Sequence, residues 1–264
     1  MTTRLHIVRK QPAVKPVILE IEGLSKGFET NGSAQPRVLE HISFSARRGE
    51  MICILGRSGC GKSTLLKILA GFWPPSSGSV RLNGQPVDRP GPDRCMVFQE
   101  DALFPWLTVR ENIAFGLKGR RMAPRDQQRE VDRFLSLVGL ADFENYLPQE
   151  ISGGMKQRVS LARVLVLQPQ VLLMDEPFAA LDAQTREEMQ NLLLDLWERL
   201  SHTVVFVTHD VNEAVLLADR IILLEKDPGR IREDITIDLP RPRKKESDRY
   251  FDVCRSMMAK INQV

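Results

Sequence analysis

The sequence of 264 residues lacks any apolar run that approaches the roughly 20 residues a membrane-spanning helix requires. Residues 1–17 are mixed polar and basic and contain no continuous apolar segment, so we expect no secretory signal.

Cysteine is scarce, and Cys53, Cys60, Cys95 and Cys254 show neither disulfide nor metal-ligand spacing. This usage fits a reducing cytosol, with Cys53 and Cys95 in the core. Cys60 is either a thiol open to alkylation or a tolerated loop position.

A strong charge imbalance is also missing. The formal net charge is +3, and no concentrated basic stripe of the kind that binds nucleic acid occurs. Hydrophobic residues make up 42% and charged residues 27% of the chain, which is ordinary for a soluble globular protein. The length suffices for one large α/β domain or for one domain with a helical lobe.

A phosphate-binding pattern stands at residues 56–63, which read Gly-Arg-Ser-Gly-Cys-Gly-Lys-Ser and fit G-x-x-x-x-G-K-[ST]. The glycines let backbone N–H groups face the phosphates, Lys62 adds a positive charge, and the Ser63 hydroxyl can ligate Mg²⁺. Residues 51–55 are expected as a buried strand and 63–70 as a helix, which places the phosphates at a helix N-terminus. The candidate nucleotide-binding residues of this loop are Gly56, Ser58, Gly59, Cys60, Gly61, Lys62, Ser63 and Thr64.

A second phosphate-site element follows an apolar strand at residues 171–174, which ends in Asp175 and Glu176. The strand end places Asp175 at the carboxyl edge of the sheet beside the phosphate loop, where it can hold Mg²⁺. Glu176 is suited to orient and polarise the attacking water. Upstream, Ser152 and two glycines precede a helix and present a hydroxyl and free N–H groups to an anion.

The N-terminal part of the chain shows strand patterns. Apolar–polar alternation predicts half-exposed strands at residues 17–22 and 38–45. A short strand at 80–82 precedes Asn83-Gly84, a dipeptide that favours a hairpin turn.

Helical periodicity replaces the strand signals from about residue 98 to 167. The helices expected there are 109–117, 125–138 and 155–167. Apolar strands return afterwards at 171–174, 204–207 and 221–224, with a helix at 183–200 capped by Asp182 between the first two. The sequence therefore predicts a parallel α/β core interrupted by a helical insertion. The last segment offers a weak strand at 231–237, a basic patch at 241–245 and a final helix.

In this order the motifs resemble those of the ATP-binding subunit of ATP-binding cassette (ABC) transporters, over essentially the whole chain. Residues 56–64 resemble the Walker A loop, and 171–175 the Walker B strand with Glu176 as the catalytic glutamate. The other correspondences are Ser152-Gly153-Gly154 with the family signature, Gln99 with the Q-loop glutamine, residues 179–182 with the D-loop that ends at Asp182, His209 with the switch histidine and Phe28 with the aromatic residue that stacks on adenine. The chain departs from the usual Leu-Ser-Gly-Gly-Gln signature at Ile151 and Met155.

The resemblance implies a P-loop NTPase of the ABC ATPase type, with a mostly parallel core, an antiparallel β subdomain and a helical subdomain at about 100–167. The ATPase domain would span 17–240, between a flexible segment 1–16 and a basic tail 241–264 with a short helix. ATP and Mg²⁺ are the implied ligands. Gln99 would contact Mg²⁺ and the lytic water, together with Ser63 and Asp175, and His209 would contact the γ-phosphate.

The resemblance also implies partners. Two such subunits, a second copy or a homologous chain, would pair head to tail and sandwich ATP between one phosphate loop and the partner's signature. Residues 90–94, 97–100 and 103–109 resemble an importer branch that takes up nitrate, taurine or alkanesulfonates delivered by a substrate-binding protein. The apolar, aromatic loop from Gln99 to Leu107 is either a local lid on the helical lobe or a docking surface. The resemblance implies that it docks on an integral membrane permease, at the cytoplasmic face of the inner (plasma) membrane.

Alternatives remain open. An ABC ATPase acting on nucleic acid or ribosomes typically carries a coiled-coil insertion or a second cassette, for which 264 residues leave no room, so we expect no nucleic-acid partner. A silent ATP sensor would not need Glu176 and His209. A GTPase fits poorly because no Asn-Lys-x-Asp sequence occurs. An exporter subunit is opposed only by the importer-like stretches, and the basic patch at 241–245 is expected to be a solvated tail.

Overall fold

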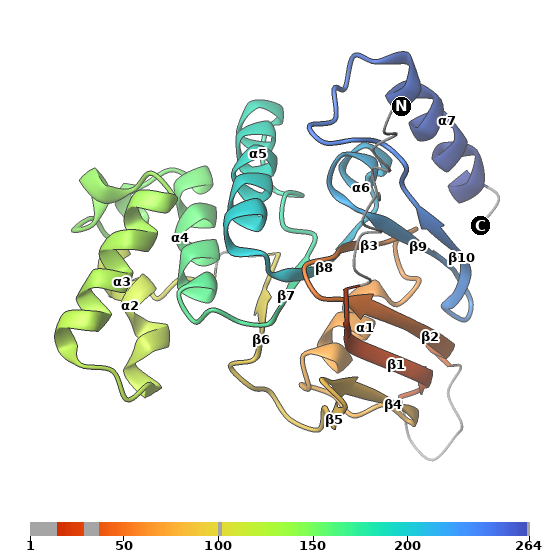
Figure 1. The fold of residues 1–264 in the computed structure, drawn as a ribbon, viewed down its shortest axis with the longest axis horizontal. Coiled ribbons are helices and arrows are strands. Elements are labelled where there is room, and N and C mark those ends of the chain that lie inside the picture. The colour runs from red at the N-terminus through yellow and green to blue at the C-terminus, as the bar shows by residue number, and fades with distance from the viewer. Residues whose placement is uncertain (1–14, 29–36, 100–101, 263–264) are drawn as a thin grey trace, which may run out of the picture.

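A central sheet and a smaller antiparallel sheet enclose the phosphate-loop helix in a computed structural model that describes residues 15–28, 37–99 and 102–262 (Figure 1). In these residues the central sheet has the strand order β10-β9-β3-β8-β7-β6. Strands β9, β3, β8, β7 and β6 are parallel, and β10 is antiparallel to β9. The bounds are β3 (Met51–Gly56), β6 (Arg94–Val97), β7 (Val171–Asp175), β8 (Thr203–Thr208), β9 (Arg220–Glu225) and β10 (Arg230–Thr236).

Both faces of this sheet are buried, and alternate residues of each strand enter two different cores. Ile52 and Ile54 of β3 pack with α1 and the smaller sheet, whereas Met51, Cys53 and Leu55 pack with the helices on the opposite face. Such two-sided burial explains why the central strands read as continuous apolar runs. The helices are α1 (Lys62–Leu69), α2 (Val109–Phe115), α3 (Pro124–Leu137), α4 (Gly153–Leu165), α5 (Ala183–Leu200), α6 (Val211–Leu217) and α7 (Asp248–Asn262), with short 3-10 turns η1 (Gly116–Gly119), η2 (Ala141–Phe143) and η3 (Pro148–Glu150).

The smaller sheet is antiparallel, with the order β2-β1-β4-β5 in the described residues. Its strands are β1 (Val17–Lys26), β2 (Leu39–Arg47), β4 (Ser77–Leu82) and β5 (Gln85–Pro86). The expected hairpin turn is present, since Asn83 and Gly84 adopt φ of +48° and +75° between the paired residues Leu82 and Gln85. Positive φ at both central positions is what a type I′ turn requires.

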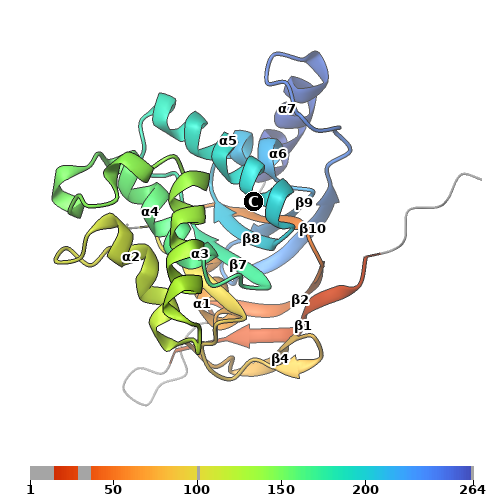
Figure 2. The same cartoon turned by 60° about the vertical axis from the view of Figure 1, so that its left-hand side comes forward.

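The helical insertion forms a lobe beside the sheets. Figures 1 and 2 show α2, α3 and α4 grouped on one side of the molecule, with α5 between this lobe and the rest of the central sheet. The predicted combination of parallel core, antiparallel β subdomain and helical subdomain is thus confirmed. Among the described residues, no helix is both long enough and apolar enough to traverse a bilayer.

The C-terminal segment differs from the sequence prediction. Arg241 and Arg243 were expected in a solvated basic tail, but both are half-buried against α6. Arg243 donates to the carbonyl oxygens of Val215 and Ala218, at 2.6 Å each, and Arg241 forms an ion pair of 2.7 Å with Asp219. The prediction was wrong because the last carbonyls of a helix lack intrahelical donors, and these guanidinium groups supply them.

The sequence pattern did not predict helix α6 or strand β6. Helix α6 has only seven residues and is buried on almost all sides, so it shows no amphipathic period. Strand β6 has only four residues and begins with the polar Arg94, so it shows no continuous apolar run.

Candidate functional site

The phosphate loop joins the end of β3 to the start of α1, and its glycines are required by its shape. Gly59 and Gly61 adopt φ of +85° and +95°, a region that other residues rarely enter. At Gly56 the φ is ordinary, but a Cβ would lie 2.7 Å from Sγ of Cys60. The thiol therefore fills the space beneath the loop.

Cys60 is consequently a core residue and not an accessible thiol. Its exposed fraction is 1%, and burial raises its pKa above the ordinary value for a thiol. The sequence left two possibilities for Cys60. The burial contradicts a thiol open to alkylation and agrees with a tolerated position in the loop. Cys53 is buried as expected, and Cys95 is half-buried.

Lys62, the first residue of α1, turns its ammonium group back into the loop. Its Nζ donates to the carbonyl oxygens of Gly56 and Arg57 at 2.8 and 3.1 Å, and lies 3.9 Å from Oε1 of Glu176. The side chain is 5% exposed. A buried ammonium needs such partners, and here they place its charge at the centre of the loop.

Ser63 and Asp175 meet although 112 residues separate them. The Ser63 hydroxyl donates to Oδ1 of Asp175 at 2.8 Å. Burial is the largest cause of the raised pKa of the Asp175 carboxyl. One hydroxyl and one carboxylate at a sheet edge form the oxygen donor set that Mg²⁺ takes when water and substrate phosphates complete its coordination, so these residues fit that ion.

Glu176 and His209 face each other beside the loop. Nδ1 of His209 lies 3.1 Å from Oε2 of Glu176, while the Glu176 N–H donates to the carbonyl of Val207 at 3.1 Å. Glu176 has φ of +43°, an uncommon conformation for a residue with a side chain, and such conformations cluster at functional sites. The backbone thereby turns the carboxylate out of β7 toward the loop.

A pocket of about 430 Å³ lies at this point and is lined by Arg57, Ser58, Glu176, His209, Ile261 and Asn262. The sequence analysis missed the last two residues, which belong to the end of α7. Nothing in local spacing could reveal them, because they lie more than 50 residues beyond His209. Of the candidate residues from the sequence, Ser58, Glu176 and His209 line this pocket, whereas Lys62, Ser63, Asp175, Gln99, Phe28 and Ser152 do not.

The signature turn caps a helix. Ser152 precedes α4, and its hydroxyl oxygen accepts the N–H of Met155 at 3.3 Å. A Cβ on Gly153 would meet nothing within 4 Å, whereas a Cβ on Gly154 would lie 2.5 Å from Cγ2 of Thr185 at the start of α5. The sequence analysis missed Gln157, a buried residue of α4 that donates to the carbonyl of Pro177 at 2.7 Å and so supports the turn after Glu176.

The remaining candidates lie at the edges of the site. Asp182 caps α5 as expected, accepting the N–H and hydroxyl of Thr185 at 3.0 and 2.8 Å. Gln99 is exposed just beyond the end of β6. Phe28 is 37% exposed and packs edge-on against Trp73, with 5.3 Å between the ring centroids. The sequence analysis did not identify Trp73.

Comparisons with known proteins show the family to which the whole chain is similar. The family described as ABC transporter matches residues 39–179. A nitrate import ATP-binding protein of Synechococcus elongatus is 48% identical over 212 residues, which are 79% of this chain and 77% of that protein. A bicarbonate transport ATP-binding protein of the same species is 44% identical over 254 residues, covering 94% and 91% of the two chains.

A solved structure shows the same fold. It is a dimeric, post-hydrolysis state of an ATP-binding cassette with ADP and inorganic phosphate. It superposes with a TM-score of 0.73 at 29% identity, over 84% of this chain and all of the other.

Proposed function

This chain belongs to the ABC transporter family and is an ATPase of that family, and we propose that it energises the import of a small anion through a membrane permease. The observation that carries the proposal is the kinship with proteins named for nitrate import and bicarbonate transport, which extends over more than three-quarters of the chain in each case. These names favour a small oxyanion; taurine or an alkanesulfonate is the other substrate type that the importer-like stretches suggested.

The phosphate loop is proposed to bind the triphosphate of ATP. Its backbone N–H groups and Lys62 would stabilise the negative charge that develops on the phosphates, because both are fixed before the substrate arrives. Ser63 and Asp175 would hold Mg²⁺ together with Gln99, which follows β6, the strand paired with β7. When bound there, the ion would neutralise charge on the β- and γ-phosphate oxygens.

Glu176 is proposed to act on the attacking water. The water oxygen bonds to the γ-phosphorus, the bond from phosphorus to the bridging oxygen breaks, and Glu176 accepts the water proton. His209 shares a contact of 3.1 Å with this carboxylate through Nδ1, which leaves the other ring nitrogen available to the γ-phosphate. ADP and inorganic phosphate are the products.

A second copy or a homologous subunit is proposed to complete the site. Ser152, Gly153 and Gly154 begin a helix of 13 residues, and the free N–H groups and positive dipole end of such a helix favour a phosphate. Ser152 opens α4, on the helical lobe, and a partner that pairs head to tail would bring its own signature turn to this chain's phosphate loop. The dimeric cassette with ADP and phosphate gives a precedent for this pairing.

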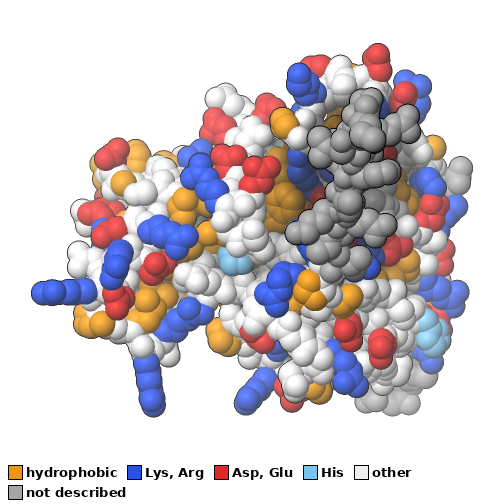
Figure 3. All heavy atoms as spheres, viewed as in Figure 1, with side chains coloured by type: hydrophobic (Ala, Val, Ile, Leu, Met, Phe, Trp, Pro, Cys, Tyr) orange, Lys and Arg blue, Asp and Glu red, His pale blue; other side chains and the backbone are white. Residues whose placement is uncertain are grey.

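An aromatic surface on the helical lobe is proposed as the permease contact. Trp106 is 71% exposed and Phe115 is 43% exposed, and both rings contact Phe104. Figure 3 shows hydrophobic side chains exposed on this lobe among charged ones. Exposed aromatic clusters are costly in water and typical of protein interfaces. Glu100 and Asp101, which the sequence assigned to the same docking loop, lie outside the described residues.

Copurification tests this function. The tagged chain is expressed in its native cell, membranes are solubilised gently, and the recovered proteins are identified. We expect a multi-span permease, whose companion binding protein is then titrated with nitrate, bicarbonate and taurine. Trp106→Asp should release the permease, whereas Phe251→Asp, at a 54% exposed ring on α7, should retain it. Recovery with ribosomes or nucleic acid instead would refute the importer function and leave the ATPase intact.

A further inference from the structure

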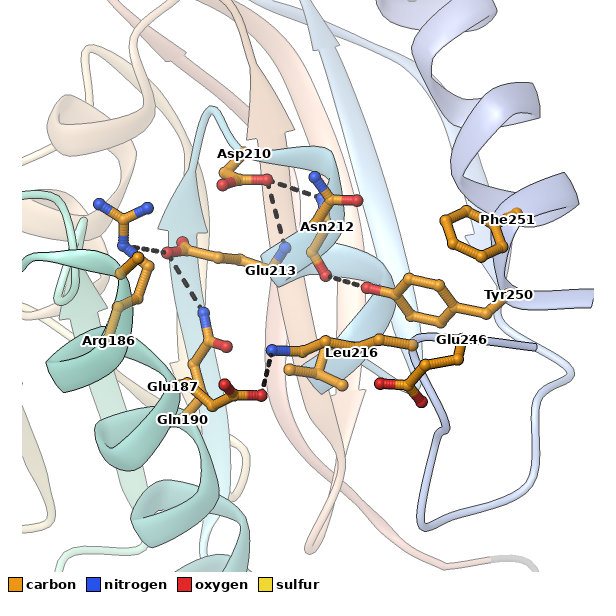
Figure 4. Close-up of a pocket in the computed structure, with 12 residues that line it drawn as sticks. Arg186, Glu187, Gln190, Asp210, Asn212, Glu213, Leu216, Glu246, Tyr250 and Phe251 are labelled. Atoms are coloured by element: carbon orange, nitrogen blue, oxygen red, sulfur yellow. Dashed lines mark hydrogen bonds and ion pairs between the residues drawn. The ribbon is translucent and has the colours of Figure 1, made fainter. Parts of the chain in front are cut away.

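Glu213 is a buried carboxylate close to the candidate site, and the proposed chemistry does not use it. It lies in the first turn of α6 with an exposed fraction of 5%, at the wall of a cleft of about 550 Å³ between α5, α6 and the C-terminal segment (Figure 4). Burial is the largest cause of its raised pKa. A buried carboxylate needs hydrogen-bond donors or a positive partner. Here Thr208 and Arg186 supply them, and each belongs to a different part of the site.

The first connection leads to the segment that contains His209. The hydroxyl of Thr208 donates to Oε2 of Glu213 at 2.8 Å, and the same oxygen of Thr208 accepts the N–H of Asp210 at 3.0 Å. Asp210 in turn accepts the backbone N–H of Glu213 at 3.4 Å. The residues on both sides of His209 are therefore fixed to Glu213, whereas the imidazole itself is 61% exposed.

The second connection leads to the loop after Glu176. Nε of Arg186 lies 3.8 Å from Oε1 of Glu213, and Arg186 also donates to the carbonyl oxygens of Phe178 and Leu181 at 3.3 and 2.8 Å. Figure 4 shows Arg186 approaching Glu213 from α5, with Gln190 beside it. One guanidinium group thus links the carboxylate to the turn that joins Glu176 to Asp182.

We propose that Glu213 and Arg186 are positioning residues for ATP hydrolysis, which hold the backbone around His209 in register with the loop of residues 178–182. Neither touches the pocket that contains Glu176. The inference rests on the proposed role of His209. We therefore expect Glu213 and Arg186 to affect the rate of ATP turnover. They should have little effect on nucleotide binding, because neither side chain contacts the phosphate loop.

The test compares conservative variants. Glu213→Gln keeps the shape of the side chain and an acceptor for Thr208, but removes the charge that attracts Arg186. We expect kcat for ATP to fall about tenfold, with KM and the Kd of a fluorescent ATP analogue within about twofold. Glu187→Gln is the matched control. This residue lines the same cleft, but its ion pair of 2.9 Å is with Lys245 and it contacts neither loop, so kcat should stay at the wild-type value.

A double variant that also carries His209→Ala distinguishes a positioning role from general destabilisation of the fold. If Glu213 acts through His209, adding Glu213→Gln to His209→Ala should lower kcat by less than about twofold further. A full additional tenfold loss would overturn the inference. Should Glu213→Gln fail to fold, Arg186→Lys is measured, because one ammonium cannot serve two carbonyls and the carboxylate in the planar geometry of Arg. It should lower kcat at unchanged Kd.

The two proposals fail separately. If His209→Ala retains wild-type turnover, the proposed role of His209 is wrong and the positioning inference falls with it. If His209→Ala loses turnover while both Glu213→Gln and Arg186→Lys keep wild-type kcat, only the positioning inference is overturned.

Discussion

Gly154 lies directly against Thr185, so that a Cβ at position 154 would stand 2.5 Å from Cγ2 of the threonine. The threonine cannot easily rotate away, because its hydroxyl donates to Oδ2 of Asp182 at 2.8 Å. This contact joins the start of α4 to the start of α5. The glycine is thus needed for packing within one chain, quite apart from any role toward a nucleotide.

Gly154→Ala should lower the stability of the isolated chain. The added methyl must displace Thr185, at a cost of about 1–3 kcal/mol for an overpacked contact, partly offset by about 1 kcal/mol of helix propensity. For a net loss of about 1 kcal/mol, thermal unfolding should show a Tm lower by about 2–4 °C. Gly153→Ala is the matched control, since its Cβ meets nothing within 4 Å. Thr185→Ser, which removes the obstructing methyl, should restore the Tm of the Gly154 variant; a lowered Tm for both glycine variants would argue against this contact.

Lys62→Ala and Glu176→Gln should separate binding from turnover. Lys62→Ala removes the charge at the centre of the phosphate loop, and we expect ATP affinity to fall about 10- to 100-fold, the value of a charge-assisted hydrogen bond. Glu176→Gln keeps the side-chain shape but removes the base, and should lower kcat by about 100-fold or more at nearly unchanged affinity.

The dimer provides a second readout for the same pair of variants. With ATP present, light scattering should detect a stable dimer of Glu176→Gln and a monomer of Lys62→Ala. A Glu176→Gln chain that binds ATP and stays monomeric would contradict the proposed sandwich of ATP between two subunits.

The sequence predicted the parts of the site that are continuous in the chain. The phosphate loop and the Asp175-Glu176 pair each follow an apolar strand. The carboxyl ends of parallel strands share one sheet edge, and there Ser63 meets Asp175 across the intervening strand β8. The signature turn and the cap at Asp182 were likewise visible as local patterns.

Contacts that depend on packing between distant elements could not be predicted in this way. The bond from Gln157 to the carbonyl of Pro177 joins two elements whose relative placement no periodicity encodes. The basic residues Arg241 and Arg243 looked like a solvated run because charge pattern alone does not reveal the unpaired carbonyls at the end of α6. Helix α6 itself was too short and too completely buried to show a period.

Cys60 should react slowly with N-ethylmaleimide in the folded protein. Its raised pKa lowers the thiolate fraction at any given pH, by tenfold for each pKa unit, and burial blocks approach of the reagent. At pH 7.5 we expect labelling at least about tenfold slower than in the guanidinium-unfolded chain, with the rate rising as pH increases toward the higher pKa. Peptide mass spectrometry of quenched samples measures this, and equal rates in both states would show that the thiol is accessible.

Arg243→Ala should destabilise the fold through the end of α6. Its guanidinium Nη1 donates to the carbonyl oxygens of Val215, Leu216 and Ala218 at 2.6, 3.2 and 2.6 Å. Removing it leaves the carbonyl oxygens of three buried residues without this donor, which should lower the free energy of unfolding in urea by about 1–3 kcal/mol. Arg255→Ala is the control within the same C-terminal segment, because that side chain is 81% exposed and pairs only loosely, at 3.8 Å, with Asp252. Its effect should remain below about 0.5 kcal/mol. A loss below about 0.5 kcal/mol for Arg243→Ala as well would mean that α6 does not depend on this cap.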